Sequence, residues 1–351
     1  MGRSAELARF VTREGRGIEI GPWCNPVAPK RSGYNCRILD VFDTATLRQR
    51  AGVDPGIPES AIAGIEEVDF VGSSTCIADL VGASDTMGTF DYIVSSHNFE
   101  HLPDPLKFLQ GCEKVLRPGG VLSMAIPDRR CCFDYFRPHS SLAELLAAFF
   151  EQRERPTQAQ IFERWSLQAR RVMNGEEAIS FPLAEDMSSI LPFDSLHTAF
   201  AMWQDFVGNP DELYRDTHCW VFTPASCELI LADLRFLGLI AFEIVDVTAT
   251  SGNEFYVHLQ KASGLANDWG RQDQAQFYTD RRDLIRRAYS EASFPPATGK
   301  QLQQTIAEQW RRIAELEGRV SLMDPLLHNG TVATPVRVLM RMVYRLFRHL
   351  T

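Results

Sequence analysis

The chain has 351 residues, of which 45% are hydrophobic and 23% are charged, as in most soluble globular proteins. Its formal net charge of −9 argues against a nucleic-acid-binding protein, because phosphate backbones attract basic surfaces. No apolar run reaches the length of a membrane span, no apolar leader is visible, and the eight cysteines include no C-x-x-C pair, so we expect a cytoplasmic protein with reduced thiols.

The first 130 residues alternate predicted strands with helical stretches. The predicted strands are residues 17–21, 36–42, 66–71, 90–96 and 120–126. Between the last two, apolar residues recur at helical spacing from 106 to 116, and "RPGG" then ends the helix. This repetition predicts a parallel α/β sheet, which binds ligands at the carboxyl ends of its strands.

Residues 128–236 break that alternation with a helical, aromatic stretch in which we predict no strand. Helices are expected at 140–152, 157–173, 196–208 and 223–238, the first with a Ser cap and the last with a Thr cap followed by Pro. Two β runs, 239–250 and 253–262, follow and are joined by "SGN", a hairpin signal. We expect this antiparallel pair to return to the sheet.

Three segments are predicted after residue 263. Residues 264–299 read as a polar linker with one helix at 277–290. Residues 300–324 read as a short coiled coil that would pair two copies of the chain through 302–323, or as an amphipathic helix packed on the domain. Residues 325–351 predict a basic amphipathic helix. Its part 335–350 would either dock on a partner protein or on this protein, or contact the inner face of the membrane peripherally.

The stretch "GIEIGPWCNPVAPK", residues 17–30, begins like a nucleotide-binding strand. Ile18 and Ile20 share one face of that strand, and Gly21 ends it. A glycine lets a ligand approach the backbone closely, whereas the pyrophosphate of a dinucleotide requires further glycines, which are missing here. Asp40 ends the second strand, where a carboxylate can accept hydrogen bonds from ribose hydroxyls; Asp43 is the alternative.

Four segments, "GIEIGP", "ILDVFD", "FDYIVSSHNFEHLPDP" and "LRPGGVLSMAIPD", resemble in order the motifs of class I S-adenosylmethionine-dependent methyltransferases. The resemblance spans about residues 15–130. It implies a Rossmann-like seven-stranded sheet with the last strand antiparallel, a domain at 1–263 with a helical substrate cap at 128–236, and S-adenosylmethionine as cofactor. The residues it implies for the cofactor are Glu19, Gly21, Pro22, Asp40, Asp69, Ser96, His97 and Glu100.

A narrower resemblance concerns the acceptor. "PDRRCCFDYFRP", "DTHCWVFTPAS" and "GNEFYVHL" are similar to methyltransferases found with bacterial glycosyltransferases that build surface polysaccharides such as O-antigen. This resemblance implies methylation of a sugar hydroxyl in a polysaccharide, glycolipid or nucleotide sugar, with a glycosyltransferase as a partner. Two alternatives stay open: a methyltransferase of a natural product or lipid quinone, and a non-catalytic scaffold of a glycan-assembly complex.

A sugar hydroxyl is a poor nucleophile at neutral pH, so a general base is expected in the cap. His218 is the first candidate, His197 is the second, and Asp134 is an acid in the same cap. We expect no metal, because no cluster of ligands is spaced for one. The side chains predicted to contact the acceptor are Arg129, Arg130, Tyr135, Arg137 and Trp220.

Overall fold

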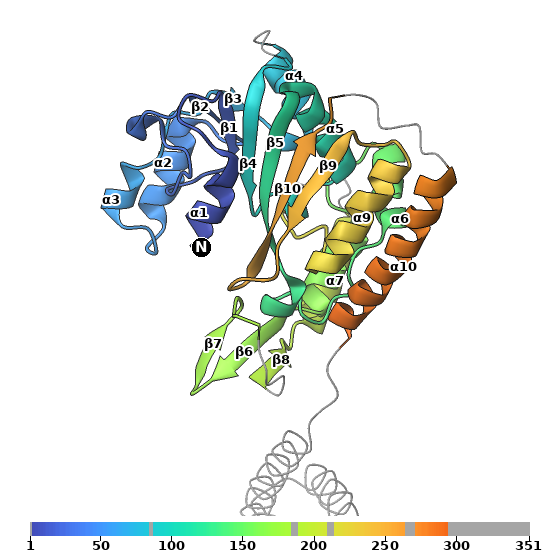
Figure 1. Cartoon of the computed structure of the whole chain (residues 1–351). Helices are drawn as coiled ribbons and strands as arrows, with labels where there is room; N and C mark the ends of the chain where they lie inside the picture. The colour runs from blue at the N-terminus through green and yellow to red at the C-terminus, as the bar shows by residue number, and fades with distance from the viewer. Residues whose placement is uncertain (1, 84–86, 184–188, 209–213, 264–270, 294–351) are drawn as a thin grey trace, which may run out of the picture. The chain divides into compact units, whose positions relative to one another are not determined.

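Seven strands form the central sheet of the computed structural model, which describes residues 2–83, 87–183, 189–208, 214–263 and 271–293 (Figure 1). Their order across the sheet is β3-β2-β1-β4-β5-β10-β9. Their bounds are β1 Gly17–Ile20, β2 Cys36–Asp40, β3 Phe70–Val71, β4 Phe90–Ser96, β5 Leu116–Pro127, β9 Phe242–Val247 and β10 Glu254–Lys261. The first five strands are parallel, whereas β10 is antiparallel to both β5 and β9, which confirms the predicted fold class.

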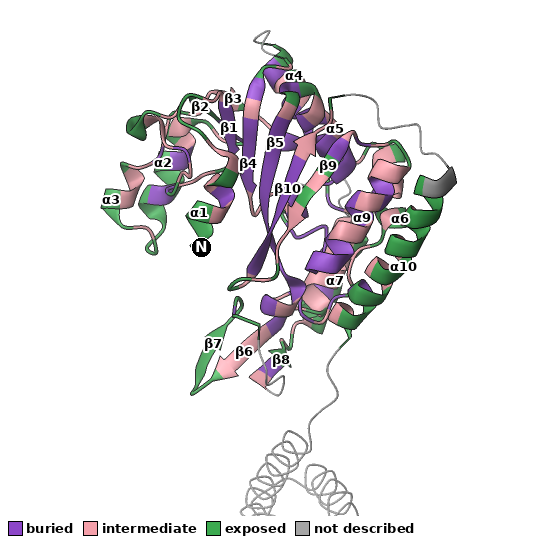
Figure 2. Cartoon of the chain, in the orientation of Figure 1, coloured by how far each residue is buried: buried purple, intermediate pink, exposed green. Residues whose placement is uncertain are grey.

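The strands alternate their side chains between two apolar layers, which explains their burial in Figure 2. Ile93 of β4 faces the main core, whereas Tyr92 and Val94 face a second cluster that includes Leu7. The third predicted strand is shortened to Phe70–Val71, because the side chain of Asp69 takes the backbone N–H of Ile38 at 2.8 Å.

Helices flank the sheet, and several of them are preceded by a capping side chain. The bounds are α1 Arg3–Leu7, α2 Thr44–Val53, α3 Glu59–Ile62, α4 Ile77–Gly82, α5 Pro105–Val115, α6 Leu142–Phe150, α7 Gln158–Ser166, α8 Leu196–Gly208, α9 Pro224–Phe236 and α10 Arg271–Ala292. Ser141 and Thr223 form capping boxes, and Asp104 caps α5. Asp43 caps α2 through the N–H of Thr46, so Asp40 alone of the two is left at the strand end.

The insertion between β5 and β9 contains a small sheet that the sequence analysis did not predict. Its strands are β6 Ala169–Met173, β7 Glu176–Ala178 and β8 Ile190–Pro192, in the order β7-β6-β8. The helix expected at 157–173 therefore ends at Ser166. The missed signal is Asn174-Gly175, whose φ angles of +53° and +85° form the two-residue turn that favours a hairpin.

The last described helix belongs to the body of the protein and not to a free linker. The helix expected at 277–290 lies within α10, which is longer at both ends. The ring of Phe277 stacks on Phe236 of α9, with 3.8 Å between the ring centroids. Arg281 of α10 donates two hydrogen bonds to Asp233 of α9, at 2.7 and 2.9 Å. The predicted coiled coil at 300–324, with its pairing segment 302–323, and the basic helix at 325–351, with its membrane segment 335–350, lie outside the described residues.

Among the described residues, no helix is both long enough and apolar enough to cross a membrane. The longest, α10, has 22 residues and carries charged side chains along its length.

Replacing Trp220 with alanine should lower the free energy of unfolding by about 3–5 kcal/mol. The indole is 1% exposed in the main core and donates a hydrogen bond to the carbonyl of Leu102, so its loss opens a cavity and removes that donor. Phe150→Ala is the control, because that side chain is 74% exposed and should change the free energy by less than about 0.5 kcal/mol. Urea unfolding measures both, and equal losses would contradict the core placement.

Candidate functional site

Three neighbouring parallel strands end at one edge of the sheet and bring the predicted cofactor residues together. β1 lies between β2 and β4, so Gly21, Asp40 and Ser96 stand at adjacent strand ends. The N–H of Gly21 donates to the carbonyl of Leu39 at 2.9 Å, which holds the first loop against β2. This edge is where parallel α/β sheets bind ligands.

Gly21 adopts φ +57°, a left-handed conformation that favours glycine. A Cβ built on it would meet no atom within 4 Å, so the space in front of this residue is open. Pro22 follows it and is half-buried. The backbone at this strand end is therefore open to a ligand.

Glu19 is buried and holds the loop after Gly21 through both of its carboxylate oxygens. Its two carboxylate oxygens accept hydrogen bonds from the N–H groups of Val27 at 2.6 Å and Ala28 at 2.9 Å. Burial raises the pKa of this carboxyl group, against the lowering effect of those two bonds. The structure thus gives Glu19 a positioning role where direct cofactor contact was one of the expectations.

The two acids expected at β2 and β3 have different surroundings. Asp40 accepts one hydrogen bond, from the N–H of Phe42 at 3.0 Å, and burial raises its pKa. Asp69 precedes β3 and pairs with Lys30 at 2.5 Å and Arg37 at 2.8 Å. The carboxylate of Asp69, which the resemblance places at the cofactor, is thus engaged in structural ion pairs.

The turn after β3 supplies polar groups that the sequence analysis did not select. Thr75 is buried, and its hydroxyl has no hydrogen-bond partner among the residues that the structure describes. Ser74 donates to the side-chain oxygen of Asn98 at 2.9 Å, which links this turn to the segment after β4. The sequence signal was the "GSS" turn of residues 72–74.

His97 follows β4 in a left-handed conformation, φ +48°, which is strained for a residue with a side chain. Its Nε2 lies 2.6 Å from a carboxylate oxygen of Glu254 on β10, which also pairs with Arg3 of α1 at 3.0 Å. Burial would lower the pKa of His97, but the hydrogen bond to Glu254 and the charge of Glu100 raise it. Arg3 also donates to the hydroxyl of Ser96, so α1 is tied to this edge.

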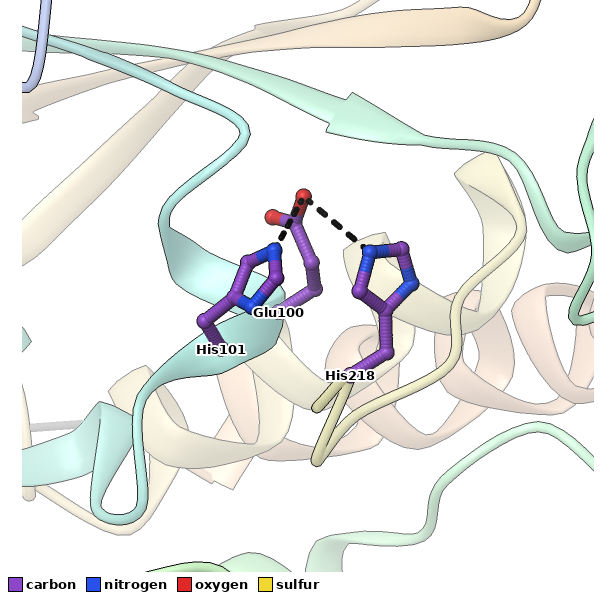
Figure 3. Close-up of side chains that lie close together, drawn as sticks. All are labelled: Glu100, His101 and His218. Carbon is purple, nitrogen blue, oxygen red and sulfur yellow. Dashed lines mark ion pairs between the residues drawn. The ribbon is translucent and has the colours of Figure 1, made fainter. Parts of the chain in front are cut away.

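A buried carboxylate lies between two imidazoles just past β4, as Figure 3 shows. Glu100 is in the 3-10 turn Phe99–His101, is 0% exposed, and has no hydrogen-bond partner on either side-chain oxygen among the described residues. Its Oε1 lies 3.9 Å from Nε2 of His101 and 4.0 Å from Nε2 of His218. We call Glu100, His101 and His218 the buried triad.

His218 is oriented by Asp134. The carboxylate of Asp134 lies 2.5 Å from Nδ1 of His218 and accepts a second bond from Arg137 at 2.7 Å. Burial alone would raise the pKa of Asp134, but Arg137 and His218 lower it to about 2. An ionised Asp134 fits a histidine with its proton on Nδ1, which leaves the Nε2 lone pair facing Glu100.

His101 repeats the same arrangement from the other side. Its Nδ1 lies 3.0 Å from the carboxylate of Asp216, and its ring stands edge-on to that of His218 at 4.7 Å between centroids. Burial would lower the pKa of His101, but Asp216 and Glu100 raise it. Each imidazole of the buried triad thus has a carboxylate oxygen within hydrogen-bonding distance of its Nδ1.

Backbone contacts hold the segment of His218 against the turn of Glu100. The carbonyl of Glu100 accepts from the N–H of Cys219 at 2.7 Å and from that of Trp220 at 3.1 Å. The indole of Trp220 donates to the carbonyl of Leu102 at 2.5 Å. Residues more than a hundred positions apart are therefore positioned with little freedom.

The five residues predicted to contact an acceptor have structural roles instead: Arg129, Arg130, Tyr135, Arg137 and Trp220. Trp220 is in the main core, and Tyr135 is 3% exposed, so neither ring has a free face to stack on a sugar. These two predictions are wrong, because aromatic spacing alone does not distinguish a stacking surface from a core.

The three arginines are likewise engaged inside the protein. Arg137 is 1% exposed and bonds to Asp134 and to the carbonyl of His218. Arg129 is buried and donates to the carbonyls of Arg137 and Ala292. Arg130 forms a two-point ion pair with the buried Asp128. Internal acceptors thus bind Arg130 and Arg137, and Arg129 is buried, which argues against the predicted contact of these arginines with an acceptor.

His197 lies in the first turn of α8 and is exposed. Among the described residues, no hydrogen bond or ion pair joins it to the buried triad. Of the candidate bases, the structure therefore brings His218 and Asp134 together and leaves His197 apart.

Comparison with known proteins gives a family. A model described as "Methyltransferase domain" matches residues 5–236 of the chain. A ubiquinone biosynthesis O-methyltransferase of Xanthomonas campestris pv. campestris is 36% identical over 47 residues, 13% of this chain and 20% of that protein. The namesake of Parvibaculum lavamentivorans is 44% identical over 41 residues, 12% and 16% of the two chains. The chain thus spans a fifth or less of the length of these relatives.

Two solved structures are also similar. A SAM-dependent methyltransferase from Aquifex aeolicus has a TM-score of 0.35 at 14% identity, over 73% of this chain and 87% of that one. A SAM-dependent methyltransferase from Methanosarcina mazei has a TM-score of 0.33 at 14% identity, over 73% and 96%.

The free energy of unfolding should depend on pH through the ionisation of the Asp134 carboxyl group. Because its pKa in the folded protein is about 2, below the ordinary 3.8, the ionised carboxylate stabilises the fold above that ordinary value, and the contribution is lost as the pH falls through 2. Between about pH 5 and pH 2, the free energy of unfolding of the wild type should fall by about 2 kcal/mol more than that of Asp134→Asn. Parallel urea-unfolding profiles for the two proteins would contradict this prediction.

Proposed function

We propose that this chain, which belongs to the methyltransferase-domain family, methylates a hydroxyl oxygen. The family model matches well over half of the chain, and the sheet has the class I topology. The protein is therefore a methyltransferase that uses S-adenosylmethionine. The observation that supports a hydroxyl acceptor is the pairing of His218 with Asp134 in the buried triad.

The residues at the strand ends fit the cofactor. The open space at Gly21 admits the methionine part of the cofactor, and the carboxylate of Asp40 can accept hydrogen bonds from the ribose hydroxyls. The hydroxyl of Thr75, which has no hydrogen-bond partner among the described residues, can bind the adenine. Bound there, S-adenosylmethionine supplies a methyl group on a positively charged sulfur. The protein's own contribution is to hold the cofactor and acceptor in line, which removes much of the entropic barrier.

A hydroxyl must lose its proton as its oxygen forms the bond to carbon. Nε2 of His218 carries a lone pair, and Asp134 is positioned to stabilise the imidazolium that proton uptake would produce. In the metal-free protein, His218 is therefore the proposed proton acceptor, and Asp134 is the residue that positions it. Arg137 acts through Asp134, because it neutralises that buried carboxylate.

For the class of acceptor, we propose a sugar hydroxyl, which the segments around residues 127–138 and 216–226 support by resemblance. A hydroxyl of a ubiquinone precursor is the second candidate, since the curated relatives carry that name. Transfer of a labelled methyl group to nucleotide sugars or extracted polysaccharide, compared with ubiquinone precursors, tests the choice. Labelling of the precursors alone would overturn the sugar proposal.

His218→Ala should reduce the rate of methyl transfer by about 10²- to 10⁴-fold, the usual contribution of acid–base catalysis. The affinity for S-adenosylmethionine, measured by calorimetry, should stay unchanged. His197→Ala is the matched control, because that histidine is exposed and away from the buried triad. Near-wild-type turnover of His218→Ala would remove His218 from the mechanism.

Asp40→Asn should weaken binding of S-adenosylmethionine by about 10-fold or more, because the ribose hydroxyls then donate to a neutral amide instead of an ionised carboxylate. Asp69→Asn is the control, since it should lower stability by unpairing Lys30 and Arg37 without changing the dissociation constant. Isothermal titration measures both variants. A wild-type protein that binds no S-adenosylmethionine would favour the scaffold alternative instead.

A further inference from the structure

We propose that the buried triad of Glu100, His101 and His218 binds one divalent transition-metal cation. The three ligand atoms, one carboxylate oxygen and two imidazole nitrogens, all lie within 4.8 Å of one another. Two histidines and one carboxylate form a common set of ligands for Zn²⁺, Fe²⁺ and related ions, and they leave coordination positions open for a substrate. The ligands come from two segments that meet only in the fold, so spacing in the sequence did not reveal them.

The first argument is the environment of the Glu100 carboxylate. It is 0% exposed, and neither oxygen has a hydrogen-bond donor among the described residues. The nearest charged groups are Nδ1 of His97 at 3.5 Å and the Nε2 atoms of His101 and His218 at 3.9 and 4.0 Å, and none of them forms a hydrogen bond to the carboxylate. A buried carboxylate without a hydrogen bond is costly, so proteins supply it with a hydrogen bond, a proton or a cation. The side chain points into the space between the two imidazole rings (Figure 3).

The second argument is the orientation of the rings. Nδ1 of His101 faces Asp216, and Nδ1 of His218 faces Asp134, at 3.0 and 2.5 Å. A histidine that binds a metal commonly donates its other ring N–H to a carboxylate, which fixes the tautomer and strengthens the ligand. Both histidines of the buried triad have this outer partner, and both direct Nε2 toward Glu100.

The third argument is the distance between the groups. If the two rings were simply ion-paired to Glu100, their N–H groups would approach its oxygens to about 2.7–2.9 Å. The observed distances from Nε2 to Oε1 are 3.9 and 4.0 Å, too long for a hydrogen bond. A cation at about 2.0–2.2 Å from each ligand lies between them after a small inward movement of the side chains.

A bound cation would change how the acceptor loses its proton, and this consequence rests on the proposed function. An acceptor hydroxyl that coordinates the cation has a lowered pKa and releases its proton to water. Its oxygen then forms the bond to the methyl carbon as the bond from that carbon to sulfur breaks. Nε2 of His218 is then a metal ligand and not the base, and the two roles exclude each other.

The experiment measures metal uptake without any methyl acceptor. The full-length protein, stripped with EDTA and dialysed, is titrated with Zn²⁺ by calorimetry and with Co²⁺ by visible absorption. We expect one equivalent of either ion to bind. Glu100→Gln and His218→Asn should weaken binding by about 100-fold or more, and Asp134→Asn, which removes an outer partner, by about 10- to 100-fold.

His197→Asn is the matched control and should bind the metal like the wild type, because that residue lies away from the buried triad. Far-ultraviolet circular dichroism shows whether each variant is folded. The proposal is overturned if the wild type takes up no stoichiometric ion, or if Glu100→Gln and His218→Asn bind it as the wild type does.

These outcomes are separate from those of the proposed function. Methyl transfer to a hydroxyl by a protein that binds no metal would leave His218 as the base and overturn only the cation. Stoichiometric binding at the buried triad in a protein that methylates no hydroxyl would keep the cation site and overturn the proposed acceptor.

Discussion

The carbonyl oxygen of Glu100 accepts two backbone N–H groups, those of Cys219 and Trp220, and the candidate site depends on this contact. It joins the turn after β4 to the end of the insertion, which are distant in the chain. The buried indole of Trp220 reinforces it through the carbonyl of Leu102. Because both partners are backbone groups in a buried region, His218 is set beside Glu100 with little conformational freedom.

Charge inside the protein is organised around the same contact. Asp134 and Asp216 each support one imidazole, and Arg137 balances Asp134 while binding the carbonyl of His218. Arg137, Tyr135 and Trp220 of the insertion are thus buried residues that support the site, and they do not form an exposed surface for an acceptor. On the cofactor side, Glu19 acts in a similar way, because it fixes the loop beside the open space at Gly21.

Much of the fold could be predicted from sequence, since it depends on local patterns. The predicted strand 90–96 matches β4 residue for residue, and the Ser and Thr caps expected before α6 and α9 are present at Ser141 and Thr223. The small sheet was missed because helical apolar spacing over 157–173 outweighed the Asn174-Gly175 turn signal. The packing of α10 on α9 depends on long-range contacts that periodicity does not report.

The sequence by itself determined the class of protein and the strand-end positions of Gly21, Asp40 and His97, because motif order and strand ends are properties of the chain. The tertiary structure decided which side chains of the insertion are buried and which meet. Arg137, Tyr135 and Trp220 read as a polar and aromatic surface in sequence, but they are internal in the fold. The buried triad also arises only there, since its ligands are brought together by non-local backbone hydrogen bonds.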